Sequence, residues 1–226
     1  MTGGERVSAY INSLYPGNSE QLDRMEADAK ASKVPIIRKE TQSLLRFLIK
    51  AHSPEKILEV GTAVGFSALF MSEYAPEGCR ITTIENYEKR IPVAREHFAR
   101  AGKEEQITLI EGDALQVLKE LKDTYDLIFV DAAKGQYISY LPEVLRLLRR
   151  GGILVSDNVL QDGDIIESRF AVERRNRTIH ARMREYLYAL THTEELTTSI
   201  LPLGDGVTIS VRTGGSLPDR KGADGI

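Results

Sequence analysis

YDLIFVDAAK (residues 125–134) and GGILVSDNVL (residues 151–160) are the two stretches that decide the fold. Each is an apolar run typical of a buried parallel strand. The first ends at Asp131 and the second at Asp157 and Asn158. A helix-sized stretch, 137–150, separates them, so the two strands can lie side by side, about 5 Å apart, with both acidic ends at one edge of the sheet. Open α/β sheets bind their ligands at that edge.

The three side chains at these strand ends predict a metal site. Two carboxylates and a carboxamide are the oxygen ligands that a hard divalent cation such as Mg²⁺ or Mn²⁺ prefers. The alternative is that Asp131, Asp157 and Asn158 only cap the helices that follow, because Asp and Asn are favoured at helix starts. A glycine-rich turn and two further acids at the same edge favour the metal interpretation.

Length and composition predict one cytoplasmic domain. The chain has 226 residues, is 42% hydrophobic and carries a formal net charge of −3, so it is not a generally basic nucleic-acid binder. Its single cysteine excludes an intramolecular disulfide, and no secretory leader or membrane-spanning run is evident. We expect a single domain over 1–213, with N-terminal helices in 1–52, and a disordered tail over 214–226.

Hydrophobic periodicity predicts a parallel sheet with helices on both faces. Helical segments at about 5–14, 19–32 and 40–53 come before the sheet. Strands are expected at 56–60, 80–85, 107–111, 126–131 and 152–156, alternating with helices at 66–75, 88–101, 114–122, 137–149 and 168–191. The stretch EELTTSILPLGDGVTISVRT (194–213) contains two β-rich runs joined by a glycine-containing link, which predicts an antiparallel hairpin at the sheet edge.

The first strand-to-helix turn, within ILEVGTAVGFSALFMS (57–72), is typical of a cofactor loop. Gly61 and Gly65 let a ligand approach the backbone at a helix N-terminus, although a tight packing turn would look similar. Their G-x-x-x-G spacing differs from the dinucleotide fingerprint, which disfavours a dehydrogenase. Glu85 closes the second strand, where a carboxylate can accept hydrogen bonds from ribose hydroxyls. Asp113 follows the third strand and is either an adenine neighbour or a helix cap.

The ordered motifs EVGTAVGFSA, TIE, EGDA, FVDAAKGQY and SDNVL resemble the cation-dependent O-methyltransferases, the family of catechol and caffeoyl-CoA methyltransferases. The resemblance covers about 34–212. It implies a Rossmann-like class I methyltransferase fold, with a seven-stranded, mostly parallel sheet and S-adenosylmethionine as methyl donor. It also implies metal ligands at Asp131, Asp157 and Asn158 and a cofactor site formed by Ile37, Glu59, Gly61, Thr62, Ser67, Glu85, Asp113, Ala114 and Asp131. Homodimers are a further implication.

Methyl transfer from a sulfonium depends mainly on positioning and electrostatics. The resemblance points to Asp131 and Lys134 as the catalytic pair, with Lys134 accepting the hydroxyl proton or stabilising the oxyanion. The alternative for Lys134 is an ordinary surface ion pair. Tyr137 and Tyr140 are candidates for the cavity wall, although helix packing also explains Tyr140.

The local motifs DAAKGQY, DNVL and ILPLGDGVTIS, together with an arginine-rich stretch, are similar to those of one branch of that family, the bacterial tRNA 5-hydroxyuridine methyltransferases. The partner expected from this likeness is a tRNA anticodon loop, whose unpaired wobble base presents a hydroxyl and a carbonyl side by side. SRFAVERRNRTIHARMRE (168–185) is rich in arginine, and Arg174, Arg175 and Arg177 are its candidate RNA contacts. An amphipathic surface helix is the competing interpretation.

Two other functions fit the same residues. A small-molecule methyltransferase acting on catechol-like phenols needs the same cofactor and metal and differs only in its acceptor pocket. A non-catalytic protein that binds an adenosine ligand or RNA would carry a degenerate site, which the complete set of metal-type ligands disfavours.

Overall fold

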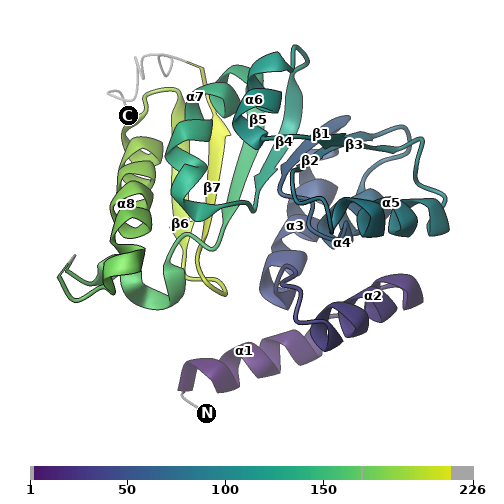
Figure 1. The fold of residues 1–226 in the computed structure, drawn as a ribbon, viewed down its shortest axis with the longest axis horizontal. Helices are drawn as coiled ribbons and strands as arrows, with labels where there is room; N and C mark the ends of the chain where they lie inside the picture. The colour runs from purple at the N-terminus through teal and green to yellow at the C-terminus, as the bar shows by residue number, and fades with distance from the viewer. Residues whose placement is uncertain (1–2, 169, 215–226) are drawn as a thin grey trace, which may run out of the picture.

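The computed structural model describes residues 3–168 and 170–214, which form a sheet flanked by helices (Figure 1). The seven strands lie in the order β3-β2-β1-β4-β5-β7-β6. β1 to β5 run parallel, whereas β7 pairs antiparallel with both β5 and β6. The strand bounds are β1 Lys56–Val60, β2 Arg80–Glu85, β3 Ile107–Glu111, β4 Tyr125–Val130, β5 Leu148–Asp157, β6 Leu196–Leu201 and β7 Val207–Arg212. The predicted fold class, including its terminal hairpin, is confirmed.

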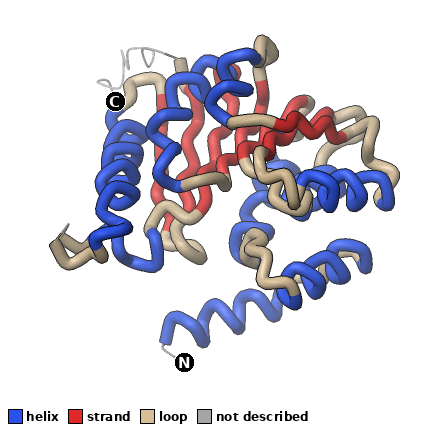
Figure 2. Tube along the Cα trace, in the orientation of Figure 1, coloured by secondary structure: helices blue, strands red, loops and turns tan. Residues whose placement is uncertain are grey.

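Helices cover both faces of this sheet (Figure 2). Alternate strand residues enter two separate apolar cores: Ile57 and Phe129 pack in one, Leu58 and Ile128 in the other. The helix bounds are α1 Gly3–Leu14, α2 Glu20–Ala31, α3 Lys39–His52, α4 Phe66–Tyr74, α5 Ile91–Arg100, α6 Ala114–Glu120, α7 Tyr137–Leu147 and α8 Arg177–His192. Short 3-10 turns are η1 Lys134–Gln136, η2 Gln161–Ile166 and η3 Arg174–Asn176. Residues from α2 to α5 contribute to the first core and residues from α6 to α8 to the second.

Two element bounds differ clearly from the prediction. β5 begins at Leu148 rather than at 152, and its register against β4 shifts between Tyr125 and Leu127. α8 begins at Arg177 rather than at 168. In place of the expected first turns there is a 3-10 turn at Arg174–Asn176, and the side chain of Arg177 donates to the carbonyls of Val172 and Phe170, which a helix would pair with backbone amides.

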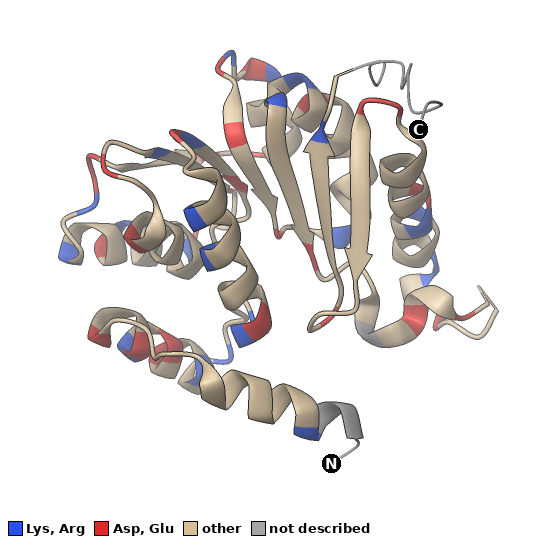
Figure 3. Ribbon diagram, turned by 180° about the vertical axis from the view of Figure 1, so that it is seen from behind, with Lys and Arg blue, Asp and Glu red and all other residues tan. Residues whose placement is uncertain are grey.

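The remaining predictions from composition concern the ends of the chain and membranes. Of the tail predicted over 214–226, all residues after Gly214 lie outside the described part of the structure. Within the residues described, no helix is both long enough and apolar enough to span a bilayer. Acidic and basic residues are both spread over the helices and strand ends (Figure 3).

Candidate active site

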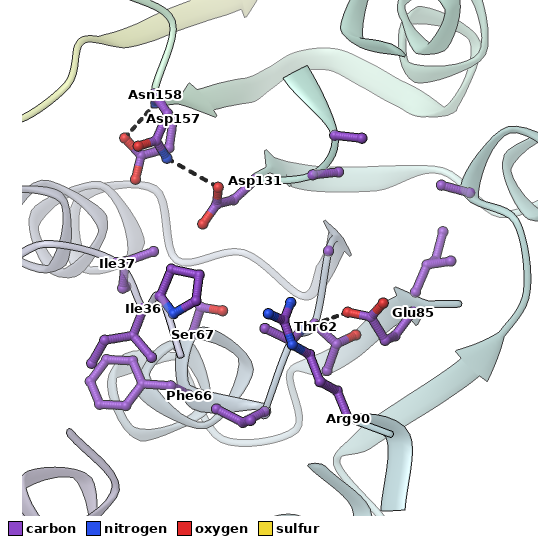
Figure 4. Close-up of a pocket in the computed structure, with 18 of the residues that line it drawn as sticks. Ile36, Ile37, Thr62, Phe66, Ser67, Glu85, Arg90, Asp131, Asp157 and Asn158 are labelled. Atoms are coloured by element: carbon purple, nitrogen blue, oxygen red, sulfur yellow. Dashed lines mark hydrogen bonds between the residues drawn. The ribbon is translucent and has the colours of Figure 1, made fainter. Parts of the chain in front are cut away.

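A cavity of about 500 Å³ opens where the parallel strands end (Figure 4). Its walls come from the loops that follow β1 to β5 and from the segment before α3. It lies where the chain order of the strands reverses, between β1 and β4, which is the ligand-binding position of open α/β sheets. The predicted site residues that line it are Ile37, Gly61, Thr62, Ser67, Glu85, Ala114, Asp131, Lys134, Asp157 and Asn158.

The acidic strand ends meet at one end of this cavity (Figure 4). Asp131 directly follows β4 and Asp157 is the last residue of β5. Asn158 Nδ2 donates to Asp131 Oδ1 at 3.1 Å, and the Asn158 backbone N–H donates to Asp157 Oδ1 at 2.8 Å. Asn158 adopts a left-handed backbone conformation with φ 59°, which Asn tolerates better than most residues. The predicted metal ligands are therefore neighbours.

Both carboxyl groups are held where ionisation is unfavourable. Burial, reinforced by the charge of Asp157, raises the pKa of Asp131 to about 7, despite opposing contributions from Lys134 and Asn158. Burial also raises the pKa of Asp157, against the effects of the Asn158 N–H and the Thr41 hydroxyl. Two buried carboxyl groups next to each other are typical of a site where a bound cation stabilises their charged forms. Within the described residues, no group of three or more His, Cys, Asp and Glu side chains is placed to hold a metal ion, so the third protein ligand of this candidate site would be the carboxamide of Asn158.

The hydroxyl group of Tyr137 forms hydrogen bonds with the backbone at both acidic strand ends. Its hydroxyl lies 3.1 Å from the Asp157 carbonyl oxygen and 3.3 Å from that of Val130, and it accepts from the Ala132 N–H at 3.3 Å. The side chain is buried and does not line the cavity, whereas Tyr140 does. Tyr137 therefore ties β4 to β5 next to Asp131, and Tyr140 belongs to the wall.

The glycine turn between β1 and α4 is shaped by close backbone packing. Gly61 has φ 105°, and a Cβ atom there would lie 2.1 Å from the Asp131 carbonyl oxygen. Gly65 has φ 84° and stands at the N-cap position of α4. The positive φ angles favour glycine at both positions. At Gly61 the turn also packs directly against the backbone of Asp131, at the end of β4.

Glu85 is fixed by the backbone around it. Its Oε2 accepts from the Ala63 N–H at 2.8 Å, and its Oε1 accepts from the N–H groups of Asn86 and Tyr87, each at 2.9 Å. These bonds link β2 to the glycine turn and hold the carboxylate at the cavity wall. A carboxylate has further lone pairs, so Glu85 can still accept from hydroxyls of a ligand.

Two residues predicted at the cofactor do not line the cavity. Glu59 is fully buried in β1, where the Thr83 hydroxyl donates to its Oε2 at 2.5 Å. Burial raises the pKa of Glu59 to about 7, although the Ser67 and Thr83 hydroxyls oppose the shift. Asp113 is exposed and caps α6 by accepting from the Gln116 N–H at 3.1 Å, which is its alternative role. Ala114, next to Asp113, is part of the wall.

Lys134 lines the acidic end of the cavity and pairs with a residue that the sequence did not indicate. Its Nζ lies 3.1 Å from Oδ2 of Asp205, which belongs to the link between β6 and β7 and is almost completely buried. The backbone of the same link accepts from the N–H groups of Val159 and Leu160. The hairpin is therefore bonded to both sides of the acidic end.

Arg38 and Arg90 also line the cavity, and nothing in their local sequence indicated this. Arg38 precedes α3, and Arg90 precedes α5, with its guanidinium 5.3 Å from the centre of the Tyr87 ring. Figure 4 shows Arg90 on the side of the cavity that holds Glu85. Only its position five residues after Glu85 could have suggested that it reaches the same wall.

The arginines proposed for RNA lie outside the cavity wall and differ from one another. Arg174 and Arg175 are exposed, and Arg175 pairs with Glu173 at 2.7 Å. Arg177 instead donates to the carbonyls of Val172 and Phe170. Arg174 and Arg175 therefore remain the more accessible candidates, whereas the side chain of Arg177 is bonded to the backbone of its own segment.

Comparison with known proteins gives a consistent result. A model of the O-methyltransferase family matches residues 7–213. A catechol O-methyltransferase of Mycobacterium tuberculosis is 33% identical over 71% of this chain and 74% of its own length. Caffeoyl-CoA O-methyltransferase 1 of Arabidopsis thaliana is 32% identical over 88% of this chain and 81% of its own.

Solved structures show the same likeness. A methyltransferase of Podospora anserina, crystallised with SAH bound, superimposes with a TM-score of 0.83 at 29% identity, over 92% of this chain and 94% of its own. The O-methyltransferase TomG of Streptomyces achromogenes, solved in complex with SAM, gives a TM-score of 0.82 at 25% identity, over 95% and 100% of the two chains.

Proposed function

The chain belongs to the O-methyltransferase family, and we propose that it methylates 5-hydroxyuridine at the wobble position of tRNA with the help of a divalent cation. Its general activity is S-adenosylmethionine-dependent O-methyl transfer, of the type carried out by catechol and caffeoyl-CoA methyltransferases. The observation that carries the proposal is the meeting of Asp131, Asp157 and Asn158 in the cavity that also holds the glycine turn and Glu85.

The wall of the cavity fits S-adenosylmethionine. Gly61 and Thr62 leave the backbone open to a ligand, and Glu85 can accept from the two ribose hydroxyls. Ser67 and Ile37 line the part of the cavity nearer α3 and α4, where the methionine portion would lie. Glu59 would act on this portion only indirectly, through the hydroxyl network beneath it.

The acidic end fits a divalent cation such as Mg²⁺ or Mn²⁺. Two adjacent carboxylates and a carboxamide form a hard oxygen donor set, and burial raises the pKa of both acids, so that a bound cation would favour their charged forms. When bound, such a cation makes a coordinated hydroxyl easier to ionise and fixes its direction. Asp131, Asp157 and Asn158 would hold it.

Protein groups then orient the acceptor and handle its proton. Asp205 holds Lys134 at the rim of the acidic end, where its ammonium group can stabilise a developing oxyanion, whereas only its neutral amine could accept the hydroxyl proton. Tyr137 keeps the two acidic strand ends in register. Positioning of the acceptor against the methyl group would supply most of the rate enhancement.

A 5-hydroxyuridine acceptor suits this arrangement. Its hydroxyl and the adjacent carbonyl form a vicinal oxygen pair that can chelate a cation as a catechol does. An unpaired anticodon base can enter a pocket without the melting of a helix. Arg174 and Arg175 are exposed and could contact the RNA phosphates.

A catechol-like phenol is the second candidate acceptor. It is favoured by the likeness to a catechol O-methyltransferase and needs no basic surface. A non-catalytic adenosine-ligand or RNA-binding protein is disfavoured, because the three candidate metal ligands are all present and adjacent.

We also propose a homodimer. Val7, Tyr10, Ile11 and Leu14 form an apolar stripe at helical spacing on α1, and each is at least 40% exposed. A second copy of the chain would cover this stripe if the α1 helices of the two copies pack against each other.

The proposal is tested by transfer of labelled methyl from S-adenosylmethionine to tRNA containing 5-hydroxyuridine, run beside a catechol acceptor, each with Mg²⁺ and with chelator. Labelling of the tRNA that requires the metal is the expected result. Labelling of the catechol alone would replace the tRNA proposal with the phenol one, and equal labelling with chelator would remove the metal.

A further inference from the structure

The segment between β5 and α8 carries two large apolar side chains that point into solvent. Phe170 is 86% exposed and Ile166 is 79% exposed, more than any other large apolar residue in the described part of the chain. Single exposed apolar side chains are common on protein surfaces, but these two stand four residues apart and are the most exposed of their kind among the described residues. Their exposure therefore calls for an explanation.

Their exposure does not arise from a loosely held segment. Ile165 and Val172, near neighbours of the two exposed residues, are buried. Arg184 donates to the Ile165 carbonyl at 2.9 Å, and Arg177 donates to the Val172 carbonyl at 3.2 Å. The segment is thus fastened through its carbonyls and two buried side chains, and this backbone directs Ile166 and Phe170 outward.

The segment also lies beside the acidic end of the cavity. It leaves β5 immediately after Asn158, and η2 begins three residues later at Gln161. From the other end, Arg182 Nη1 donates to the carbonyl of Gly135, the residue next to Lys134, at 3.0 Å. The segment therefore runs from the acidic end to α8, which contacts the loop that carries Lys134.

Positive charge accompanies the exposed side chains. Residues 168–185 contain six arginines and two glutamates, although the whole chain is slightly acidic. Arg177, Arg182 and Arg184 donate to backbone carbonyls. Arg175 pairs with Glu173 but keeps 82% of its side chain exposed, and Arg174 is exposed beside it. These two accessible cations follow the open aromatic ring of Phe170 by four and five residues, and such a combination of charge and ring suits single-stranded nucleic acid.

We propose that Phe170 stacks on an unpaired base next to the nucleotide being methylated, with Ile166 at its side and Arg174 and Arg175 on the flanking phosphates. This inference rests on the proposed tRNA function and names the residues that position the RNA. A protein partner fits less well, because the exposed neighbours Glu173, Arg174 and Arg175 are charged, and the core of a protein interface is depleted of charged residues.

Binding of an anticodon stem-loop RNA tests the inference. The RNA carries 5-hydroxyuridine at the wobble position and the fluorescent base 2-aminopurine beside it. Stacking on Phe170 should quench this fluorescence on binding to the wild-type protein. Phe170→Ala should remove the quenching and lower RNA affinity about tenfold, the size expected for one stacked base. Phe170→Trp should retain both, and S-adenosylmethionine affinity should stay unchanged in each variant.

Matched controls separate stacking and charge from general surface effects. Tyr188→Ala removes another exposed aromatic side chain, 64% exposed on α8, and should leave RNA affinity unchanged. Arg174→Ala and Arg175→Ala should each reduce the slope of log affinity against log salt by about one. Arg100→Ala, which removes an exposed arginine of α5, should not.

The outcomes of these experiments distinguish the stacking role of Phe170 from the proposed tRNA methylation. Wild-type protein that methylates the RNA while Phe170→Ala binds and quenches normally would overturn the stacking role and leave the tRNA function intact. Wild-type protein that methylates a catechol but not the RNA would overturn both. Loss of catechol methylation in Phe170→Ala, with RNA binding unchanged, would overturn the stacking role and make the segment a cover for a phenol acceptor.

Discussion

At the scale of single residues, the site is defined by buried carboxyl groups whose ionisation is unfavourable. Glu59 is completely buried, and Asp131 and Asp157 face each other's charge at adjoining strand ends. The pKa of each group is raised, chiefly by burial. An arrangement that only stabilised the fold would avoid this cost, so the cluster is best explained by ligands that bring positive charge.

The pKa of Asp131 predicts that protons compete with the metal. With a pKa of about 7, Asp131 is mostly protonated below that pH, and a cation must displace the proton. Metal affinity should therefore fall about tenfold for each pH unit below 7. Calorimetric titration with Mn²⁺ between about pH 5.5 and 8 would measure it. A flat profile would contradict the prediction.

Replacing Asp131 tests its role as a ligand. Loss of a supporting contact around a metal typically costs about 10–100-fold in affinity or activity, so Asp131→Asn should lower both by about 100-fold or more. The variant should remain folded because it removes an unfavourable buried charge. Asp123→Asn, an exposed acid at the other end of β4, is the matched control and should behave like the wild type.

Glu59 should make the metal-free protein less stable as pH rises. Folding raises its pKa from 4.5 to about 7, so between these values the folded state binds more protons than the unfolded state. Its contribution to the free energy of unfolding is present below about pH 4.5 and is lost as pH rises through 7, by about 3 kcal/mol.

Glu59→Gln should therefore flatten the pH dependence of stability. Urea unfolding of both proteins at about pH 5 and pH 7.5, without metal or cofactor, would show it. The exposed residue Glu120 offers a control, since Glu120→Gln should keep the wild-type slope. An equally steep slope in Glu59→Gln would show that Glu59 does not titrate in this range.

At the scale of elements, the glycine turn is where β1, α4 and the end of β4 come into contact. Gly61 requires a positive φ and also has no room for a Cβ atom, whereas Gly78 has φ 83° and open space where its Cβ atom would lie. Gly78→Ala should thus cost only the conformational penalty, about 1–2 kcal/mol.

Gly61→Ala should cost clearly more than that and also weaken S-adenosylmethionine binding, because Asp131 must move away. Thermal unfolding and cofactor titration of the two variants, side by side, would check this. Equal loss of stability, with normal cofactor affinity in both, would show that the close approach to Asp131 is unimportant.

Tyr137 links two strands through one hydroxyl group. Removing that hydroxyl takes away a buried donor to the carbonyls of Val130 and Asp157, so Tyr137→Phe should lower the free energy of unfolding by about 1–3 kcal/mol. It should also weaken metal binding, since Asp157 loses its support. Tyr188→Phe, on the exposed face of α8, should change neither quantity. Metal affinity unchanged in Tyr137→Phe would limit its role to stability.

At the scale of the whole molecule, the two faces of the sheet are covered and the site lies at one edge, but α1 extends along the periphery with its apolar stripe open (Figure 1). If a second copy covers this stripe, Tyr10→Asp with Leu14→Asp should convert a dimer to a monomer, because buried charges without partners are costly.

Light scattering coupled to size exclusion would measure the masses. Val93→Asp, which places a charge on an exposed apolar position of α5, is the control and should stay dimeric. A wild-type protein that is already monomeric would remove the dimer proposal.

The sequence by itself determined the sheet, its hairpin and the position of the acidic end. Apolar runs and glycine turns report the local backbone path, and parallel strands bring their ends together whatever the loops do. Asp131, Asp157, Asn158 and Glu85 could therefore be predicted from their places after strands. The family resemblance added the cofactor and the expected acceptors.

Only the tertiary structure decided the remaining contacts. Lys134 and Asp205 are 71 residues apart in the chain, and no local pattern joins them. Arg177 turns toward backbone carbonyls, and Asp113 caps a helix, although their residue types equally suit RNA and cofactor binding. Such outcomes depend on how loops cross the strand ends, which side-chain periodicity does not encode.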